Sequence, residues 1–324
     1  MQVFRKLDEV SADFGPTLVS VGNFDGVHRA HRRVLSEIVE RAKKQGCKSI
    51  AVTFEPHPIR ILRPDSGLRL IAPTTEKIRL LSETGIDAAL LLPFTRDLSL
   101  MSPHQFAHDI LKKALHAQEV HEGYNFHFGH QAEGDIDSLA KFGGELGFKV
   151  ECYPEMRLRR EPVSSSHIRK LIAQGQISRA RHLLARPFNI LSTAGRGRGY
   201  GSQYTVPTIN LSRYEELVPK HGVYVTRTRV GEECFDSVTN VGNRPTFGAD
   251  SFAIETHLLN FHPLELTAET EVEIHFLDRI RDEKKFESVE ALREQIGRDV
   301  KRAHRYFHLL ARIEARKHAP QCGK

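Results

Sequence analysis

Two different patterns of apolar and polar positions divide the chain. From about residue 17 to residue 185, short apolar runs alternate with helical patterns. The runs at 18–22, 49–54, 88–92 and 148–153 are strand-like. Between the first two lies a helical stripe made of Val34, Leu35, Ile38, Val39 and Ala42. The sequence Ser102-Pro103-His104-Gln105 predicts a second helix start, with a capping box and proline at the first helical position. This alternation predicts a mostly parallel sheet with helices on its faces.

Beyond Pro187 the apolar residues recur at every second position, and turns interrupt them. The segments 223–226, 237–241, 252–259 and 271–276 have this alternation, which is typical of antiparallel strands. A final helix is predicted after Ser288, because Val289, Leu292, Ile296, Val300 and Phe307 keep a helical spacing. We therefore expect two domains, an α/β domain at 1–185 and an antiparallel β-barrel with a C-terminal helix at 186–324.

Composition narrows the class of protein. The chain has 324 residues, of which 40% are hydrophobic and 27% charged, as in soluble globular proteins. Its longest apolar run, near 88–94, is far shorter than the ~20 residues of a membrane span, and the first residues lack the apolar core of a signal peptide. The four cysteines lie far apart, which predicts unpaired thiols in a reducing compartment. We expect a cytoplasmic protein without a membrane partner.

The charge balance points to anionic partners. Lysine and arginine number 47 against 41 acidic residues, which gives a formal charge of +6. This charge suits nucleic acids, anionic membranes and phosphorylated metabolites alike. A glycine- and arginine-rich run at 195–201 is short and does not repeat, so we do not expect nucleic-acid binding from it.

The strongest chemical signal follows the first predicted strand. Residues 23–31 read NFDGVHRAH and lead into a helix, and unpaired N–H groups at such a strand-to-helix turn bind phosphate. Gly22 and Gly26 allow a close approach of the backbone. His28 and His31, three residues apart, can face the same way and donate to phosphate oxygens. Taken alone, the pair also fits structural histidines, whereas a zinc site lacks a third ligand nearby.

Four segments resemble a known family in their order and spacing. Residues 21–31, 52–58, 122–129 and 163–169 are similar to its GNFDGVHxGH, TFxPHP, GxxFxFG and ISSTxIR motifs. The family is that of the HxGH nucleotidyltransferases, specifically the adenylyltransferase module of the bacterial bifunctional riboflavin kinase/FMN adenylyltransferases. The glycine between the two histidines of the motif is Ala30 in this chain.

The resemblance implies roles for the residues of these segments. His28 and His31 would stabilise the α-phosphate of ATP during its transfer, and Asn125 would place the flavin. The residues that would bind the nucleotide are Gly22, Asn23, Phe24, Gly26, Ser164, Ser165 and Arg169. Without the resemblance, the serines at 164–166 fit an ordinary helix cap equally well.

The second half resembles the riboflavin kinase module of the same family. Residues 206–211 are similar to its PTAN motif, which implies nucleotide binding by Pro207 and Mg²⁺ binding by Thr208 and Asn210. Glu255 matches the catalytic glutamate, which would act as the general base on riboflavin. Residues 240–248 and 281–286 resemble the NxGxRPTFG and RDExKF segments, and Arg281 would lie beside the flavin. On the sequence alone, Glu255 also fits a solvent-facing strand position.

The expected protein is thus a bifunctional enzyme, with a Rossmann-like adenylyltransferase domain and a kinase barrel. It would use ATP and Mg²⁺ to convert riboflavin to FMN and FMN to FAD, as a monomer or weak homo-oligomer. One alternative is a riboflavin kinase with a degenerate first domain, because Ala30 departs from the motif. Another is a non-catalytic regulator that binds flavin or nucleotide.

Overall fold

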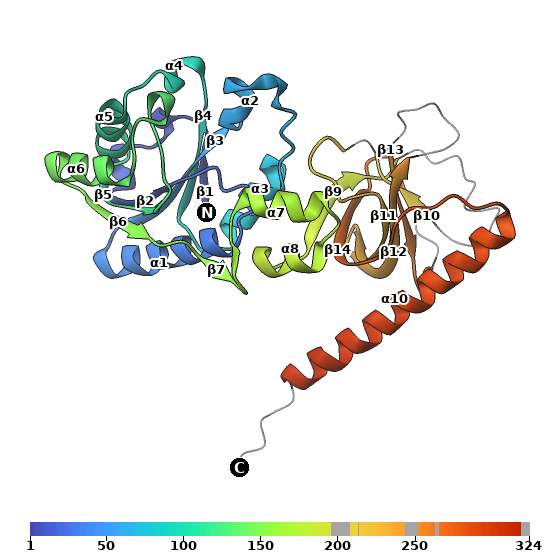
Figure 1. Ribbon diagram of the computed structural model, residues 1–324. Coiled ribbons are helices and arrows are strands. Elements are labelled where there is room, and N and C mark those ends of the chain that lie inside the picture. The colour runs from blue at the N-terminus through green and yellow to red at the C-terminus, as the bar shows by residue number, and fades with distance from the viewer. Residues whose placement is uncertain (196–207, 213, 244–251, 263–265, 319–324) are drawn as a thin grey trace, which may run out of the picture. The chain divides into compact units, whose positions relative to one another are not determined.

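The chain forms two compact units, Met1–Ile168 and Arg169–Lys324. The computed structural model describes residues 1–195, 208–212, 214–243, 252–262 and 266–318 (Figure 1). Pro207, residues 196–201 of the glycine-rich run and residues 244–248 of the segment similar to NxGxRPTFG lie outside these described residues.

The first unit is built on a parallel six-stranded sheet. Its strand order is β1-β4-β3-β2-β5-β6, and all five ladders are parallel, as predicted. The strands are β1 Gln2–Phe4, β2 Thr17–Val21, β3 Lys48–Glu55, β4 Ala88–Pro93, β5 Ala117–Gly123 and β6 Lys149–Tyr153. A short hairpin, β7 Arg157–Leu158 and β8 Glu161–Pro162, follows.

Helices connect these strands. The α-helices are α1 Arg29–Gln45, α2 Pro58–Leu62, α3 Thr74–Ser82, α4 Arg96–Ser99, α5 Pro103–Gln105 and α6 Ile136–Leu146. Helix α7, Ser165–Ala173, begins in the first unit and continues into the second. Between α5 and β5 lies a π-helix, η4 Phe106–Ala114. Short 3₁₀ turns are η1 Leu7–Glu9, η2 Ala12–Phe14, η3 Pro64–Ser66 and η5 His130–Ala132. The predicted capping box is confirmed, since Ser102 and Gln105 exchange side-chain to main-chain hydrogen bonds.

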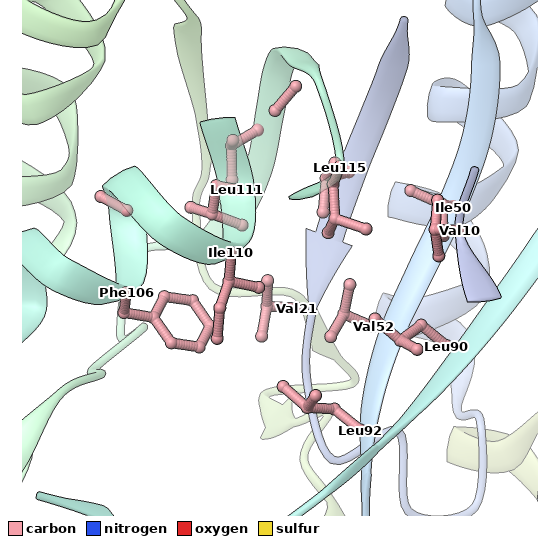
Figure 2. Packing of buried hydrophobic residues seen from close by; sticks show 14 of the residues in the cluster. Val10, Val21, Ile50, Val52, Leu90, Leu92, Phe106, Ile110, Leu111 and Leu115 are labelled. Atoms are coloured by element: carbon pink, nitrogen blue, oxygen red, sulfur yellow. The ribbon is translucent and has the colours of Figure 1, made fainter. Parts of the chain in front are cut away.

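Apolar clusters cover both faces of the sheet. On one face, Leu35, Ile38 and Ala42 of α1 pack with residues of α3 and the strands. On the other, the π-helix places Phe106, Ile110 and other residues against Val21, Val52 and Leu90 (Figure 2). Burial on both faces explains why these strands read as short continuous apolar runs rather than as alternating ones.

Strand β5 was not predicted, because its buried positions are polar. Glu119, His121 and Glu122 are all at most 4% exposed, and together they replace the apolar run that marks the other central strands. Glu119 accepts from Arg41, Gln45 and His121, which compensates the burial of its charge.

The second unit is an antiparallel barrel. Its strand order is β10-β13-β12-β11-β14-β9, and a bridge between Ala194 and Leu211 joins the two outer strands. This bridge closes the sheet, as the alternation predicted. The strands are β9 Phe188–Thr193, β10 Thr208–Asn210, β11 Gly222–Val230, β12 Glu233–Asn243, β13 Phe252–Leu258 and β14 Glu271–Arg281.

Five buried hydroxyl groups form a closed ring inside this barrel. Thr226 bonds Ser237 and Thr239 at 2.8 and 2.7 Å, Thr228 bonds Ser237 and Thr256 at 2.8 and 3.1 Å, and Thr239 bonds Thr256 at 2.9 Å. Each hydroxyl takes part in two of the five bonds, so every donor is used. Because a one-residue slip would turn these side chains outward, the ring fixes the register of three strands.

Two helices complete the second unit. Helix α8, Ile177–Leu184, buries four apolar residues and packs against β14 and β9. It therefore lies in the second compact unit, which begins at Arg169. The long helix α10, Val289–His318, begins where predicted: the Ser288 hydroxyl accepts from the Ala291 N–H at 3.1 Å. Its Ala303 and Phe307 pack on Val223, Val225 and Val238 of the barrel.

Candidate active sites

The first candidate site lies at a topological switch point of the parallel sheet. From β2 the chain passes to β3 and then β4 on one side, and it returns on the other side of β2 as β5. In open α/β sheets, ligands bind at the carboxyl ends of the strands at such a point. The turn after β2 carries His28 and His31, and the turn after β5 carries Asn125, whose side chain is exposed. The fold thus brings two of the predicted segments to the same end of the sheet, where the strands have their carboxyl ends.

The turn between β2 and α1 has an unusual backbone. Phe24, Gly26 and Val27 have φ values of 45°, 76° and 38°, in the left-handed region. A Cβ on Gly26 would lie only 2.8 Å from Ile71 Cγ2, so both conformation and space require glycine there. Asp25 ties the turn to the segment at 71–72, because its carboxylate accepts from the N–H groups of Ile71 and Ala72 at 2.9 and 3.3 Å. We call residues 22–28 the cradle.

His28 and His31 lie against each other at the start of α1. Their rings stack with centroids 3.6 Å apart and planes at 15°. His28 is the N-cap residue, and its Nδ1 accepts from the His31 N–H at 3.4 Å. The buried ring of Phe24 meets His31 edge-on, with centroids 5.1 Å apart. The predicted pairing of the two histidines on one side of the helix start is therefore present.

Burial keeps both histidines uncharged near neutral pH. Desolvation lowers the pKa of His28 from 6.5 to about 4. It also lowers the pKa of His31 well below 6.5, and the neighbouring His28 adds to this effect. Since Nδ1 of His28 accepts a hydrogen bond, the neutral ring carries its proton on Nε2. His31 Nδ1 is buried without a hydrogen-bond partner in the described part of the chain.

The serines predicted to bind nucleotide lie beside the cradle. The Ser165 hydroxyl donates to the main-chain carbonyl of Asp25 at 2.9 Å. Ser164 accepts from the His167 N–H at 3.3 Å, so it also acts as a cap of α7. Arg169, one turn further on this helix, belongs to the second compact unit, and its nucleotide contact stays a prediction.

Three buried polar residues near the cradle were not predicted as site residues. Thr53 and Glu122 lie within the quoted motif segments, but nothing in the sequence separated them from structural positions. Lys77 interrupts the apolar side of α3 that carries Leu80 and Leu81, and this break was its only signal. Glu122 accepts from the Val21 N–H at 2.5 Å where β2 ends, and burial raises its pKa well above 4.5, which favours the protonated form.

The second candidate site lies on the outer face of the barrel. Glu255 of β13 is the register partner of Asn210 on β10 and of Asn240 on β12. Directly paired residues of antiparallel strands project to the same side, with Cβ atoms about 4.5 to 5.5 Å apart. Thr208, two positions before Asn210, shares that side. The pairing thus brings the predicted metal ligands to the predicted base.

These oxygen groups fit a hard cation. Thr208 supplies a hydroxyl and Asn210 a carbonyl, which are ligand types that Mg²⁺ accepts alongside ATP phosphates. In the described residues, no group of three or more His, Cys, Asp or Glu residues could hold a metal ion. Both donors are uncharged, so they suit a cation whose charge the nucleotide phosphates balance.

Arg281 forms an ion pair that its sequence motif did not reveal. Its guanidinium binds the carboxylate of Asp299 on α10, with N–O distances of 2.8 to 3.2 Å. Asp299 is only 4% exposed. The guanidinium also lies 5.7 Å from the ring centroid of Phe286. Arg281 thus joins β14 to α10, and its flavin contact stays a prediction.

The described residues include no helix that is both long and apolar enough to cross a membrane.

Two family models match the chain in succession. The model of FAD synthetase matches residues 11–167, and that of riboflavin kinase matches residues 184–307. The first range includes His28, His31 and Ser165 but not Arg169, and the second includes Asn210 and Glu255.

Relatives that match nearly their whole length also resemble this chain. A bifunctional riboflavin kinase/FMN adenylyltransferase from Pseudomonas fluorescens is 34% identical over 93% of this chain and 96% of its own. Proteins of the same name from Escherichia coli strain K12 and Listeria monocytogenes are each 31% identical over 90% of this chain, and over 93% and 92% of their own.

A solved structure has the same fold over nearly the whole chain. It is described as a macrolide-efflux protein from Streptococcus pneumoniae and superposes with a TM-score of 0.84. The match covers 93% of this chain and 98% of that one, at 24% sequence identity. At this identity the likeness concerns the fold alone.

Proposed function

The chain belongs to the bifunctional riboflavin kinase/FMN adenylyltransferase family, and from this premise we propose which of its residues carry out the two reactions. It phosphorylates riboflavin with ATP to give FMN, and it joins FMN to the AMP part of a second ATP to give FAD and pyrophosphate. We assign the second reaction to residues 1–185 and the first to residues 186–324. The matched ranges of the two family models support this assignment.

FAD formation is assigned to the cradle. The observation that carries this assignment is the stacked pair of uncharged histidines at the N-terminus of α1. A neutral His28 donates from Nε2, and together with His31 it stabilises charge that develops on the α-phosphate as the FMN phosphate attacks. The main-chain N–H groups of Gly22, Asn23, Phe24 and Gly26 bind the phosphates, with Ser164, Ser165 and Arg169. Asn125 holds the flavin.

FMN formation is assigned to the outer face of the barrel. Glu255 accepts the proton of the ribityl 5′-hydroxyl as that oxygen attacks the γ-phosphate of ATP. Thr208 and Asn210 hold Mg²⁺, which neutralises phosphate charge when bound. The direct register pairing of Glu255 with Asn210 supports this proposal. Pro207 and Arg281 are assigned to the nucleotide and the flavin respectively.

The setting in the cell is also proposed. We infer a cytoplasmic enzyme that acts as a monomer or weak homo-oligomer, with riboflavin, FMN and ATP as its small-molecule partners. Cys47, Cys152 and Cys234 are free thiols, which supports a reducing compartment.

Separate inactivation of the two sites tests the assignment. Purified protein is supplied with ATP and Mg²⁺ together with either riboflavin or FMN, and the products are separated by chromatography. We expect His28→Ala/His31→Ala to lower FAD formation by about 10²- to 10⁴-fold and to leave FMN formation unchanged. Glu255→Gln should give the opposite pattern.

Matched controls come from the same units. His104 and His108 are an exposed pair with stacked rings in the first unit, so His104→Ala/His108→Ala should retain both activities. Glu269→Gln changes an exposed acid of the second unit and should do the same. Parent rates of FAD formation in the His28/His31 variant would overturn the assignment of the first site.

A further inference from the structure

We propose that Lys77 is a positioning residue for FAD formation, which acts through Thr53 on the cradle. This inference rests on the assignment of FAD formation to the cradle. Lys77 is on the first turns of α3, and its side chain is only 4% exposed. No motif quoted for the family includes it.

A chain of hydrogen bonds joins the lysine to the cradle. Lys77 Nζ donates to Thr53 Oγ1 at 3.0 Å, and Thr53 Oγ1 donates to the main-chain carbonyl of Asn23 at 3.1 Å. Because the ammonium is a donor only, it leaves the hydroxyl proton of Thr53 free to point at Asn23. The lysine thus sets the direction of the bond that reaches the cradle.

Asn23 immediately precedes the left-handed turn that places His31. The Phe24 backbone has a φ of 45°, and its ring meets His31 edge-on. A bulky residue with positive φ persists only where its surroundings hold it. The bond from Thr53 holds the peptide next to this residue, so it helps fix the Phe24 ring and, through it, the ring of His31.

Stability alone does not explain a lysine at this position. Removing an ammonium group from water costs several kcal/mol, and an apolar residue of similar length is often more stabilising there. Among the residues that the structure describes, Lys77 has a hydroxyl and the more distant Phe54 carbonyl, at 3.4 Å, as its hydrogen-bond acceptors. The charges of Glu55 and Asp25 favour its ammonium form, but burial outweighs them and lowers its pKa. We therefore attribute the buried ammonium group of Lys77 to its hydrogen bond with Thr53, which holds the cradle.

Lys77→Met and Thr53→Val test this role, because both keep the shape of the side chain and remove the bond. Each variant is assayed for FAD formation from FMN and ATP. We expect kcat to fall about 10- to 100-fold, as for a small displacement of a reacting group. The KM for FMN should change less than about threefold, since the flavin contacts remain. Thr53→Ser keeps the hydroxyl and should restore most of the rate.

The double variant shows whether the two residues act in one chain. If Lys77 works through Thr53, Lys77→Met/Thr53→Val should be no slower than the slower single variant. The proposal would be overturned if the kcat of the double variant fell by the product of the two single decreases. A Thr53→Val variant with the parent kcat would also overturn it, because Lys77 would then act directly. Parent kcat in Lys77→Met would also overturn it.

Controls separate this inference from folding and from the assignment of the site. Lys112 also donates to a main-chain carbonyl, that of Gly147 at 3.0 Å, so Lys112→Met should keep the parent rate. The melting temperature of Lys77→Met should not fall, and its FMN formation should stay unchanged.

If His28→Ala/His31→Ala keeps forming FAD, the site assignment fails. If that variant is inactive while Lys77→Met keeps the parent kcat, only the present inference fails.

Discussion

The hydroxyl of Ser165 donates a 2.9 Å hydrogen bond to the main-chain carbonyl of Asp25, 140 positions earlier in the chain. Asp25 is the centre of the cradle, and its carboxylate is already used by the N–H groups of Ile71 and Ala72. One aspartate thus joins three segments of the first unit. This relationship explains how the start of α7 is held at the phosphate-binding turn.

Ser165→Ala should slow FAD formation by about 3- to 10-fold, because a single hydrogen bond between uncharged groups contributes about 0.5 to 1.5 kcal/mol. FMN formation should not change. The adjacent Ser166 is exposed, so Ser166→Ala is the matched control. Steady-state assays of both reactions measure the effect, and equal rates in the two variants would contradict a role for the Ser165 bond.

His28 should titrate near pH 4 in the protein without nucleotide, because burial disfavours its charged form. Proton NMR of the histidine ring signals measures this, with His28→Gln to identify the signal. A midpoint near 6.5 would contradict the structure.

The lowered pKa of His28 also makes the free energy of unfolding depend on pH. The unfolded chain takes up a proton at His28 near pH 6.5, before the folded protein does. The stability that the neutral ring provides is therefore complete above pH 6.5 and is lost as the pH falls towards about 4. For this one histidine the loss is about 3 kcal/mol. His28→Gln should show a shallower dependence of unfolding free energy on pH over this interval.

Ala30→Gly should not improve FAD formation, although glycine is the residue that the family motif has there. Ala30 lies inside α1 and has no positive φ, so its methyl group requires no special backbone. Glycine should instead destabilise the helix by at most about 1 kcal/mol. We expect a rate within about threefold of the parent. A rise of tenfold or more would show that the methyl group obstructs the nucleotide.

Arg281→Met should destabilise the second unit by about 3 to 5 kcal/mol, because it leaves the buried carboxylate of Asp299 without its cation. Arg281→Met/Asp299→Leu removes both charges and should recover most of the melting temperature. This double variant then tests the proposed flavin contact. A raised KM for riboflavin in the restored protein would support that contact, and an unchanged KM would leave Arg281 as a structural residue.

Patterns along the chain were enough to predict most elements of the fold. The parallel sheet, the antiparallel second half, the capping box at Ser102 and the cap at Ser288 are confirmed. Strand β5 was missed because Glu119, His121 and Glu122 fill positions that apolar residues usually occupy. The hydrogen-bond donors that allow Glu119 to be buried, among them Arg41 and Gln45 of α1, come close to it only when α1 has packed on the sheet.

The sequence by itself determined the two kinds of domain, their order and the residue types at each site. These properties depend on local periodicity and on motifs of a few adjacent residues. Only the tertiary structure decided which of those residues meet. Ser165 reaches Asp25, Glu255 pairs with Asn210, and Lys77 reaches Asn23 through Thr53. Strand order and register set these contacts, and they result from packing the whole sheet, which no single segment encodes.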